Sequence, residues 1–150
     1  MELLRKDIEI MAPVGCWESL AAAINAGADS VYFGIEHLNM RARSSVNFTT
    51  QDMHTIVEHC KKVGVKTYLT VNTVMYPEDM PLMHEIIDNA KQAGVSAIIA
   101  SDVAVMQYAN QQGVEVHLST QLNIANVDAL KFYSLFADFL NLVERRHLSF

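Results

Sequence analysis

The hydrophobic and polar positions along the chain repeat one unit, in which an amphipathic stretch ends at a glycine and an apolar, β-branched run follows at once. The amphipathic stretches place apolar residues at intervals of three and four, which predicts helices, and the runs predict strands. A glycine can adopt the left-handed conformation that closes a helix, so each unit can turn directly into its strand. These junctions with their strands lie at residues 26–33, 63–71, 93–99 and 112–118.

Further apolar runs at residues 8–12 and 138–143 extend this pattern at both ends. The expected order is about six strands that alternate with about five helices. Thr49 precedes the second predicted helix as a candidate N-cap, and Pro77 marks the expected start of the third. Strands separated by helices are expected to be parallel. No linker or low-complexity tract divides the chain, so residues 1–150 are expected to form a single domain.

Two parallel architectures fit this order, an open doubly wound sheet and a (β/α) barrel. The loop after the first predicted strand has a single glycine, Gly15, and lacks the glycine spacing of a phosphate-binding loop. This disfavours the open nucleotide-binding sheet. Polar residues instead follow nearly every predicted strand, which is typical of a barrel mouth. These residues are Glu36, Asn72, Thr73, Ser101, Asp102, Ser119, Thr120, Gln121 and Glu144.

We therefore expect an α/β fold of the TIM-barrel type that is incomplete. A full barrel has eight strands and typically about 250 residues, whereas this chain has 150 residues and about six predicted strands. An unclosed barrel leaves its first and last strands as open edges. The expected partner is therefore a second copy, giving a homo-oligomer, or a missing C-terminal segment.

Composition excludes several function classes. The net charge of −6 disfavours general binding of nucleic acids. No apolar run has the form of a signal peptide or transmembrane helix, so no membrane partner is expected. The two cysteines, Cys16 and Cys60, form no Cys-x-x-Cys pair, so we expect a reducing, cytoplasmic setting and no iron–sulfur cluster within this chain.

Five motifs follow one another at residues 11–20, 26–34, 39–48, 69–73 and 119–126. In this order they resemble the collagenase-like peptidases, a family of unassigned catalytic type. The resemblance implies that the chain is the N-terminal portion of a peptidase barrel. Other branches of the family resemble hydroxylation factors for tRNA, ribosomal RNA or ubiquinone precursors, so the family name does not determine the chemistry. The chain departs from the family pattern at residues 143–149.

The loop at residues 37–47 carries two arginines, Arg41 and Arg43, that could hold a carboxylate or phosphate bidentately over the mouth. In the alternative interpretation they pair with acidic side chains on a solvated loop. We expect Asn72 and Gln121 to line the mouth and bind substrate. Asp102 and Ser101 are both suited to cap the following helix, and we favour Ser101 for this role. The expected ligand is a peptide or a small carboxylate.

A peptidase needs a nucleophile with a base or a metal-activated water, and the familiar signatures of both are absent from the sequence. Glu36 and Asp102 are therefore the candidate catalytic acids, and a divalent metal ion is the candidate cofactor, with no metal ligands assigned. His117 lies inside a predicted strand, where a structural role in the barrel interior is expected. Three functions stay open: a peptidase, a hydroxylation or RNA-modification factor, and an inactive fragment or structural subunit.

Overall fold

The computed structural model of the chain describes residues 8–39 and 48–140. Its strands are β1 (Met11–Pro13), β2 (Ser30–Phe33), β3 (Lys66–Val71), β4 (Ala97–Ala100), β5 (Val116–Leu118) and β6 (Phe139–Leu140). The helices are α1 (Trp17–Asn25), α2 (Thr50–Lys62), α3 (Met80–Ala93), α4 (Val103–Gln112) and α5 (Val127–Tyr133). Two short 3₁₀ turns, η2 (Pro77–Asp79) and η3 (Thr120–Leu122), precede α3 and follow β5.

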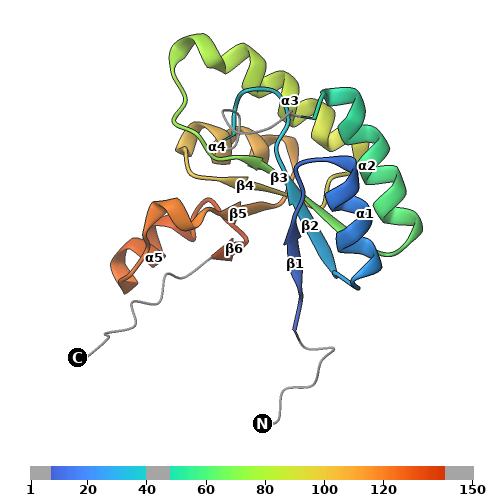
Figure 1. Cartoon of the computed structure of the whole chain (residues 1–150). Helices are drawn as coiled ribbons and strands as arrows, with labels where there is room; N and C mark the ends of the chain where they lie inside the picture. Colours follow the sequence, from blue (N-terminus) through green and yellow to red (C-terminus); the bar gives the residue numbers. More distant parts are fainter. Residues whose placement is uncertain (1–7, 40–47, 141–150) are drawn as a thin grey trace, which may run out of the picture.

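The six strands form one sheet in the order β1-β2-β3-β4-β5-β6, and every neighbouring pair is parallel. Because consecutive strands are neighbours, each intervening helix crosses over on the same side of the sheet. Figure 1 shows this helical layer around the curved sheet, with β1 and β6 at its two ends. This is the arrangement of a (β/α) barrel that is not closed, and the predicted fold class is confirmed.

The junctions between helices and strands follow the pattern expected from the sequence. Gly27, Gly64, Gly94 and Gly113 have φ angles of 80°, 73°, 77° and 72°, in the left-handed region. Thr49 is the N-cap of α2, and its hydroxyl accepts a hydrogen bond from the Asp52 backbone N–H at 3.1 Å. Pro77 opens η2, and α3 begins only at Met80.

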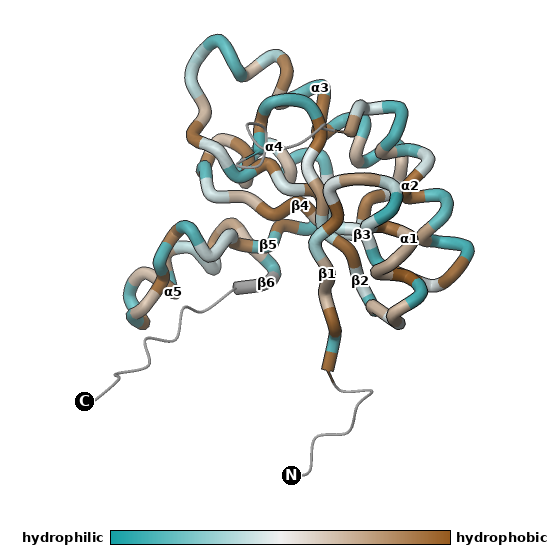
Figure 2. Tube along the Cα trace, in the orientation of Figure 1, coloured by the Kyte–Doolittle hydropathy of each residue, from teal (hydrophilic) through white to brown (hydrophobic). Residues whose placement is uncertain are grey.

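The core lies between the sheet and the helical layer. Alternate strand residues such as Phe33, Leu69 and Ile98 point to this side and are almost fully buried, where they meet helix residues such as Met53 and Ile87. Burying a side chain of this size stabilises the fold by about 1.5–3 kcal/mol. Figure 2 shows hydrophobic positions along strands such as β4 and an alternation of hydrophobic and hydrophilic positions along the helices.

Two groups of large hydrophobic side chains are exposed at the ends of the sheet. Ile8, Ile10 and Met11 lie at and before β1. At the other end, α5 and the residues after it expose Val127, Phe132 and Leu135. In a closed barrel, the remaining strand–helix units pack against the first and last units, so both groups lie where those units would be.

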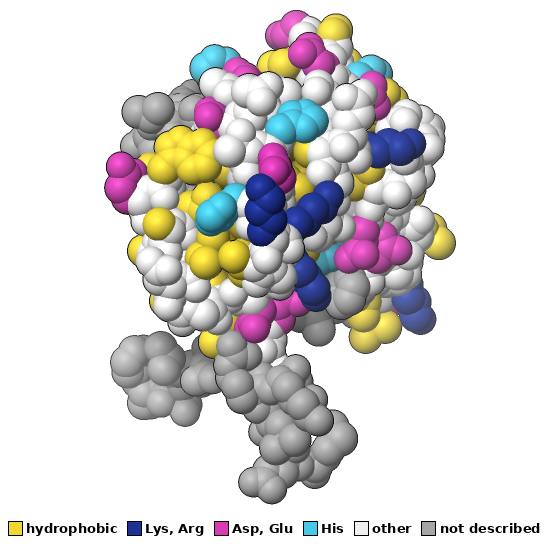
Figure 3. Space-filling model, turned by 90° about the vertical axis from the view of Figure 1, so that its right-hand side faces the viewer, with side chains coloured by type: hydrophobic (Ala, Val, Ile, Leu, Met, Phe, Trp, Pro, Cys, Tyr) yellow, Lys and Arg dark blue, Asp and Glu magenta, His cyan; other side chains and the backbone are white. Residues whose placement is uncertain are grey.

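The outer surface of the helical layer has mixed charge. Figure 3 looks onto one side of the molecule and shows basic side chains near the centre of this face, with acidic side chains beside them. Lys62 forms an ion pair with Glu58 at 2.7 Å, one turn away on α2. No helix within residues 8–39 and 48–140 is long and apolar enough to cross a membrane.

Candidate active site

The carboxyl ends of the parallel strands all lie at one edge of the sheet. The structure therefore brings Glu36, Asn72, Asp102 and Gln121 to this edge, after β2, β3, β4 and β5 respectively. Neighbouring strands are about 4.8 Å apart, so β2 and β4 are separated by about 10 Å with β3 between them. The described members of the predicted set of strand-end polar residues thus follow neighbouring strands at one edge of the sheet, and their side chains differ in what they contact.

Glu36 lies in the loop that leaves β2. Its φ angle of 49° places it in the left-handed region, which is uncommon for a residue with a side chain. Its backbone N–H donates to the Phe48 carbonyl at 3.1 Å, and its Oε1 accepts a long hydrogen bond of 3.3 Å from the Thr50 backbone N–H. The half-buried carboxylate thus lies next to the first turn of α2. A catalytic role for Glu36 stays a prediction.

Asn39 is a buried polar residue of this loop that the sequence analysis did not single out. Its side chain is 2% exposed, and its Nδ2 donates to the Ile35 carbonyl at 3.1 Å. The side chain lies directly over Gly34, where an added Cβ would collide with it. Gly34 directly follows a strand and is not at a helix end. A glycine in such a position was the available sequence signal that another group, here the Asn39 side chain, lies close to the backbone.

Asp102 is the N-cap of α4, and both of its carboxylate oxygens accept backbone hydrogen bonds. Oδ1 accepts from the Ala104 N–H at 2.8 Å, and Oδ2 accepts from the Met75 N–H at 3.0 Å. The side chain therefore joins the start of α4 to the loop after β3. This geometry gives Asp102 a positioning role, and an acid–base role for it stays a prediction.

The prediction that Ser101 caps α4 is wrong. The N-cap is Asp102, whose backbone has the extended angles of φ −97° and ψ 135° that aim its side chain at the first turn. The Ser101 hydroxyl instead donates to the Asn72 carbonyl at 2.8 Å and so ties the end of β4 to the end of β3. Next to Asn72, the Thr73 hydroxyl is buried and has no hydrogen-bond partner among the described residues.

Gln121 lies in the 3₁₀ turn η3 after β5 and is exposed. Its backbone N–H donates to the Ser119 hydroxyl at a distance of 3.4 Å, and the Ser119 N–H donates to the Ala100 carbonyl at 2.8 Å. The turn ends at Asn123 in the left-handed conformation, with φ 51°. Substrate binding by Asn72 and Gln121 stays a prediction, since only their place at the strand ends is established.

Arg41, Arg43 and Glu144 lie outside the described residues, so their predicted contribution to the mouth stays a prediction. Within residues 8–39 and 48–140, no three His, Cys, Asp or Glu side chains are grouped so as to hold a metal ion. The predicted divalent metal ion stays a prediction.

The inner face of the sheet, opposite the helical layer, carries a polar network. His117 is the only member of this network for which the sequence predicted a role. The Tyr68 hydroxyl donates to Glu9 Oε1 at 2.6 Å, and Lys66 Nζ donates to Glu9 Oε2 at 2.7 Å. The His117 ring contacts Tyr68 with 4.9 Å between ring centroids, and its Nε2 lies 2.7 Å from Glu115 Oε1. The sequence signal for this network was the alternation of side chains along the strands, which places the strand residues of the network on the face away from the helices.

Electrostatics within this network favour an ionised Glu9. Partial burial alone would raise the pKa of Glu9, but the hydrogen bonds from Lys66 and Tyr68 outweigh it and lower this pKa to about 2. Burial, together with the hydrogen bond to Glu9, raises the pKa of Tyr68. Tyr68 therefore acts as a neutral hydrogen-bond donor and Glu9 as a fixed negative charge at ordinary pH.

Comparison with known proteins points to one family. The sequence profile of peptidase family U32 matches residues 15–142. A collagenase of Porphyromonas gingivalis is 66% identical over 142 residues, which is 95% of this chain and 34% of that protein. The tRNA hydroxylation protein P1 of Bacillus subtilis is 33% identical over 133 residues, which is 87% of this chain and 31% of that protein. The chain spans about a third of the length of these relatives.

Solved structures agree on the architecture. A U32 peptidase matches 89% of this chain and 57% of its own chain, with a TM-score of 0.72 at 15% identity. A deoxyribose phosphate aldolase from Aeropyrum pernix matches 89% of this chain and 63% of its own, with a TM-score of 0.64 at 16% identity. At such low identity the likeness concerns the fold alone, and in both cases the solved chain extends beyond the matched part.

Proposed function

Because the chain belongs to peptidase family U32, we propose that it is the N-terminal part of a peptidase barrel that binds peptides at the carboxyl ends of its strands. The observation that carries this proposal is the 66% identity with the Porphyromonas gingivalis collagenase across 95% of the chain. The geometry supports it, because active sites of (β/α) barrels are built from the strand ends where Glu36, Asn72 and Gln121 lie.

We assign the acid–base step to Glu36 in preference to Asp102. Both oxygens of Asp102 already accept backbone hydrogen bonds, whereas the hydrogen bond to Glu36 Oε1 is long. In peptide hydrolysis, the Glu36 carboxylate accepts a proton from the attacking water as the new C–O bond forms. The proton then passes to the leaving amine nitrogen as the C–N bond breaks. A divalent metal ion, if bound, would activate the same water.

Arg41 and Arg43 are proposed to hold a carboxylate of the substrate, such as a peptide C-terminus or an acidic side chain. A planar guanidinium matches a carboxylate through two parallel hydrogen bonds. Both arginines follow Glu36 in the sequence, within the segment that joins β2 to α2.

A second candidate function is RNA hydroxylation, which the 33% identical tRNA hydroxylation protein favours. In that case Arg41 and Arg43 would bind a small carboxylate metabolite in place of a peptide. The net charge of −6 gives this part of the chain little attraction for RNA, so nucleic-acid contacts would have to come from the rest of the protein.

The test is hydrolysis of quenched-fluorescent peptides, including a collagen-type Gly-Pro sequence, with and without added divalent metal ions. Glu36→Gln keeps an oxygen acceptor for Thr50 but removes the charge, and should abolish hydrolysis. Glu78→Gln makes the same change at an exposed residue of η2 and should leave hydrolysis intact. Hydrolysis that survives in Glu36→Gln would contradict the assignment of the acid–base step.

A thermal shift assay with small carboxylates distinguishes the two candidate functions. Stabilisation that is lost in Arg41→Ala, without any peptide hydrolysis by the parent chain, would favour the hydroxylation alternative. A folded protein that shows neither response would contradict both functions for this chain, which would then be a structural part of a larger protein.

A further inference from the structure

A hollow of about 640 Å³ lies at the amino-terminal end of the sheet, opposite the candidate active site. This volume is within the range of pockets that bind small molecules. The loops that lead into β2 and β3 form much of its wall, together with the residues before β1. The lining residues are Ile8, Glu9, Ile24, Gly27, Ala28, Asp29, Val63, Gly64, Val65 and Lys66.

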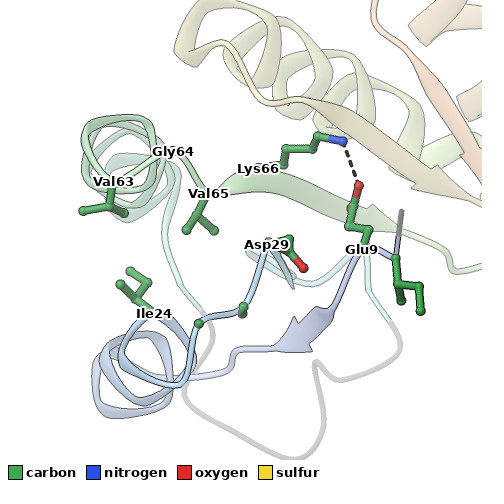
Figure 4. A pocket seen from close by; sticks show the side chains of 10 residues that line it. Glu9, Ile24, Asp29, Val63, Gly64, Val65 and Lys66 are labelled. Atoms are coloured by element: carbon green, nitrogen blue, oxygen red, sulfur yellow. Dashed lines mark hydrogen bonds and ion pairs between the residues drawn. The ribbon is translucent and has the colours of Figure 1, made fainter. Parts of the chain in front are cut away.

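The hollow has an apolar wall and a charged wall. Figure 4 shows Ile24, Val63 and Val65 together on one side, the Glu9–Lys66 ion pair on the other, and Asp29 between them. Val63 is 50% exposed, so this wall offers hydrophobic surface that nothing in the described part of the chain covers. An occupant that is apolar at one end and charged at the other would match both walls.

The described residues that line the hollow include more carboxylates than ammonium groups. Glu9 and Asp29 contribute two carboxylates and Lys66 one ammonium group, and Lys66 Nζ is already 2.7 Å from Glu9 Oε2. The Asp29 carboxylate is held in place, because its Oδ2 accepts a hydrogen bond from the Ile10 N–H at 2.7 Å.

We propose that this hollow binds a small organic cation, namely a protonated primary amine with a short alkyl chain. The ammonium group donates hydrogen bonds to the carboxylates of Asp29 and Glu9, since a primary ammonium has three donors and no acceptor. The alkyl chain lies against Ile24, Val63 and Val65, where its contact with water is reduced. The net charge of −6 on the whole chain favours the approach of cations over that of anions.

The test follows backbone amide signals by NMR during titration with hexylammonium chloride. Gly27 and Gly64 line the hollow, whereas Gly94 closes the next helix with the same left-handed conformation and does not line it. We expect saturable shifts of the Gly27 and Gly64 signals and none of Gly94. Sodium hexanoate, with the same alkyl chain and the opposite charge, should cause no saturable shift of these signals.

Two variants test the walls separately. Asp29→Asn removes one negative charge but keeps an oxygen acceptor for the Ile10 N–H, and should weaken hexylammonium binding at least fivefold. Asp128→Asn makes the same change in the exposed first turn of α5 and should leave binding unchanged. Val63→Ser removes part of the apolar wall at an exposed position and should weaken hexylammonium binding. This variant tests the proposal independently if Asp29→Asn fails to fold.

The proposal is overturned by equal binding of hexanoate and hexylammonium, by shifts at Gly94 as large as those at Gly27, or by no saturable shift at all. Equal affinities of Asp29→Asn and Asp128→Asn would overturn the assignment of the cation to the charged wall. None of these measurements depends on peptide hydrolysis, so the outcome is independent of the function proposed for the strand ends.

Discussion

Replacing Asp102 with alanine should destabilise the protein by more than the loss of a helix cap. The carboxylate accepts hydrogen bonds from two backbone N–H groups that are far apart in sequence, Ala104 at 2.8 Å and Met75 at 3.0 Å. The first bond caps α4, and the second ties the loop after β3 to the start of this helix. Alanine removes both acceptors at once, so its effect reports on the cap and on the connection between the two units.

The expected magnitude follows from the two bonds. Loss of an N-cap acceptor costs about 1 kcal/mol in free energy of unfolding. Leaving the half-buried Met75 N–H without an acceptor adds about 1–2 kcal/mol, because this group has lost its water without gaining a partner. We therefore expect Asp102→Ala to lower the free energy of unfolding by about 2–3 kcal/mol. Asp102→Asn keeps one side-chain oxygen as an acceptor for one of the two backbone N–H groups, so it should lower the free energy of unfolding by less than Asp102→Ala.

Asn126 provides a matched control, because it caps α5 through a single hydrogen bond. Its Oδ1 accepts from the Ala129 N–H at 2.9 Å, and the residue is exposed. Asn126→Ala should therefore lower the free energy of unfolding by only about 1 kcal/mol. The difference between the two alanine variants isolates the contribution of the Met75 hydrogen bond.

The assay is urea denaturation followed by far-ultraviolet circular dichroism at pH 7. Equal losses of stability in Asp102→Ala and Asn126→Ala would refute the reasoning, because the second hydrogen bond would then contribute nothing. An Asp102→Ala variant that keeps wild-type stability but loses peptide hydrolysis would refute it as well. That result would instead assign Asp102 to the chemistry.

Four further predictions concern other parts of the molecule. The shift of the Glu9 pKa from 4.5 to about 2 corresponds to about 3 kcal/mol. Solvent screening, with 36% of the side chain exposed, reduces this to about 1 kcal/mol. Because the pKa of Glu9 is lowered in the folded state, denaturation curves should show that the wild type is more stable than Glu9→Gln at pH 7. This difference in stability should be lost as the pH falls from 4.5 towards 2. A difference that grows on acidification would contradict this prediction. Cys16 is exposed, whereas Cys60 is buried, and burial raises the pKa of Cys60 to about 11. A thiol reagent should therefore label Cys16 quickly in the native protein and both cysteines after unfolding. Rapid labelling of both cysteines in the native protein would contradict the burial of Cys60 in α2. Gly34→Ala should destabilise the protein by about 2 kcal/mol by displacing Asn39, and the same change should cost less in an Asn39→Ala background; additive effects in this cycle would exclude the contact. Light scattering should find an oligomer, because both ends of the sheet expose hydrophobic side chains; a monodisperse monomer at high concentration would contradict this expectation.

Much of the fold follows from local pattern. The spacing of apolar residues predicts the helices and strands, and the glycines at 27, 64, 94 and 113 mark the turns between them. The alternation of helix and strand predicts the parallel order, which the sheet confirms. These features depend on residues close together in sequence, and periodicity alone determines which face of each element is buried.

Pair contacts between distant residues could not be predicted in this way. Ser101 and Asp102 are adjacent and both suit an N-cap, and only the backbone angles at the end of β4 decide between them. The hydrogen bond from Met75 to Asp102 joins residues 27 positions apart, and that from Tyr68 to Glu9 joins residues 59 apart. Such pairs depend on the register of neighbouring strands and on loop conformations.

The sequence by itself determined the family and the (β/α) architecture, and it predicted polar residues after the strands, because these are properties of motifs and periodicity. The tertiary structure alone decided what these side chains contact: Asp102 joins the start of α4 to the loop after β3, and Glu36 lies beside the first turn of α2. It also placed Asn39, which the sequence did not indicate, in a buried position over Gly34. The hollow at the opposite end of the sheet also has no local signal. Its walls come from three segments that meet only because the first three strands lie side by side.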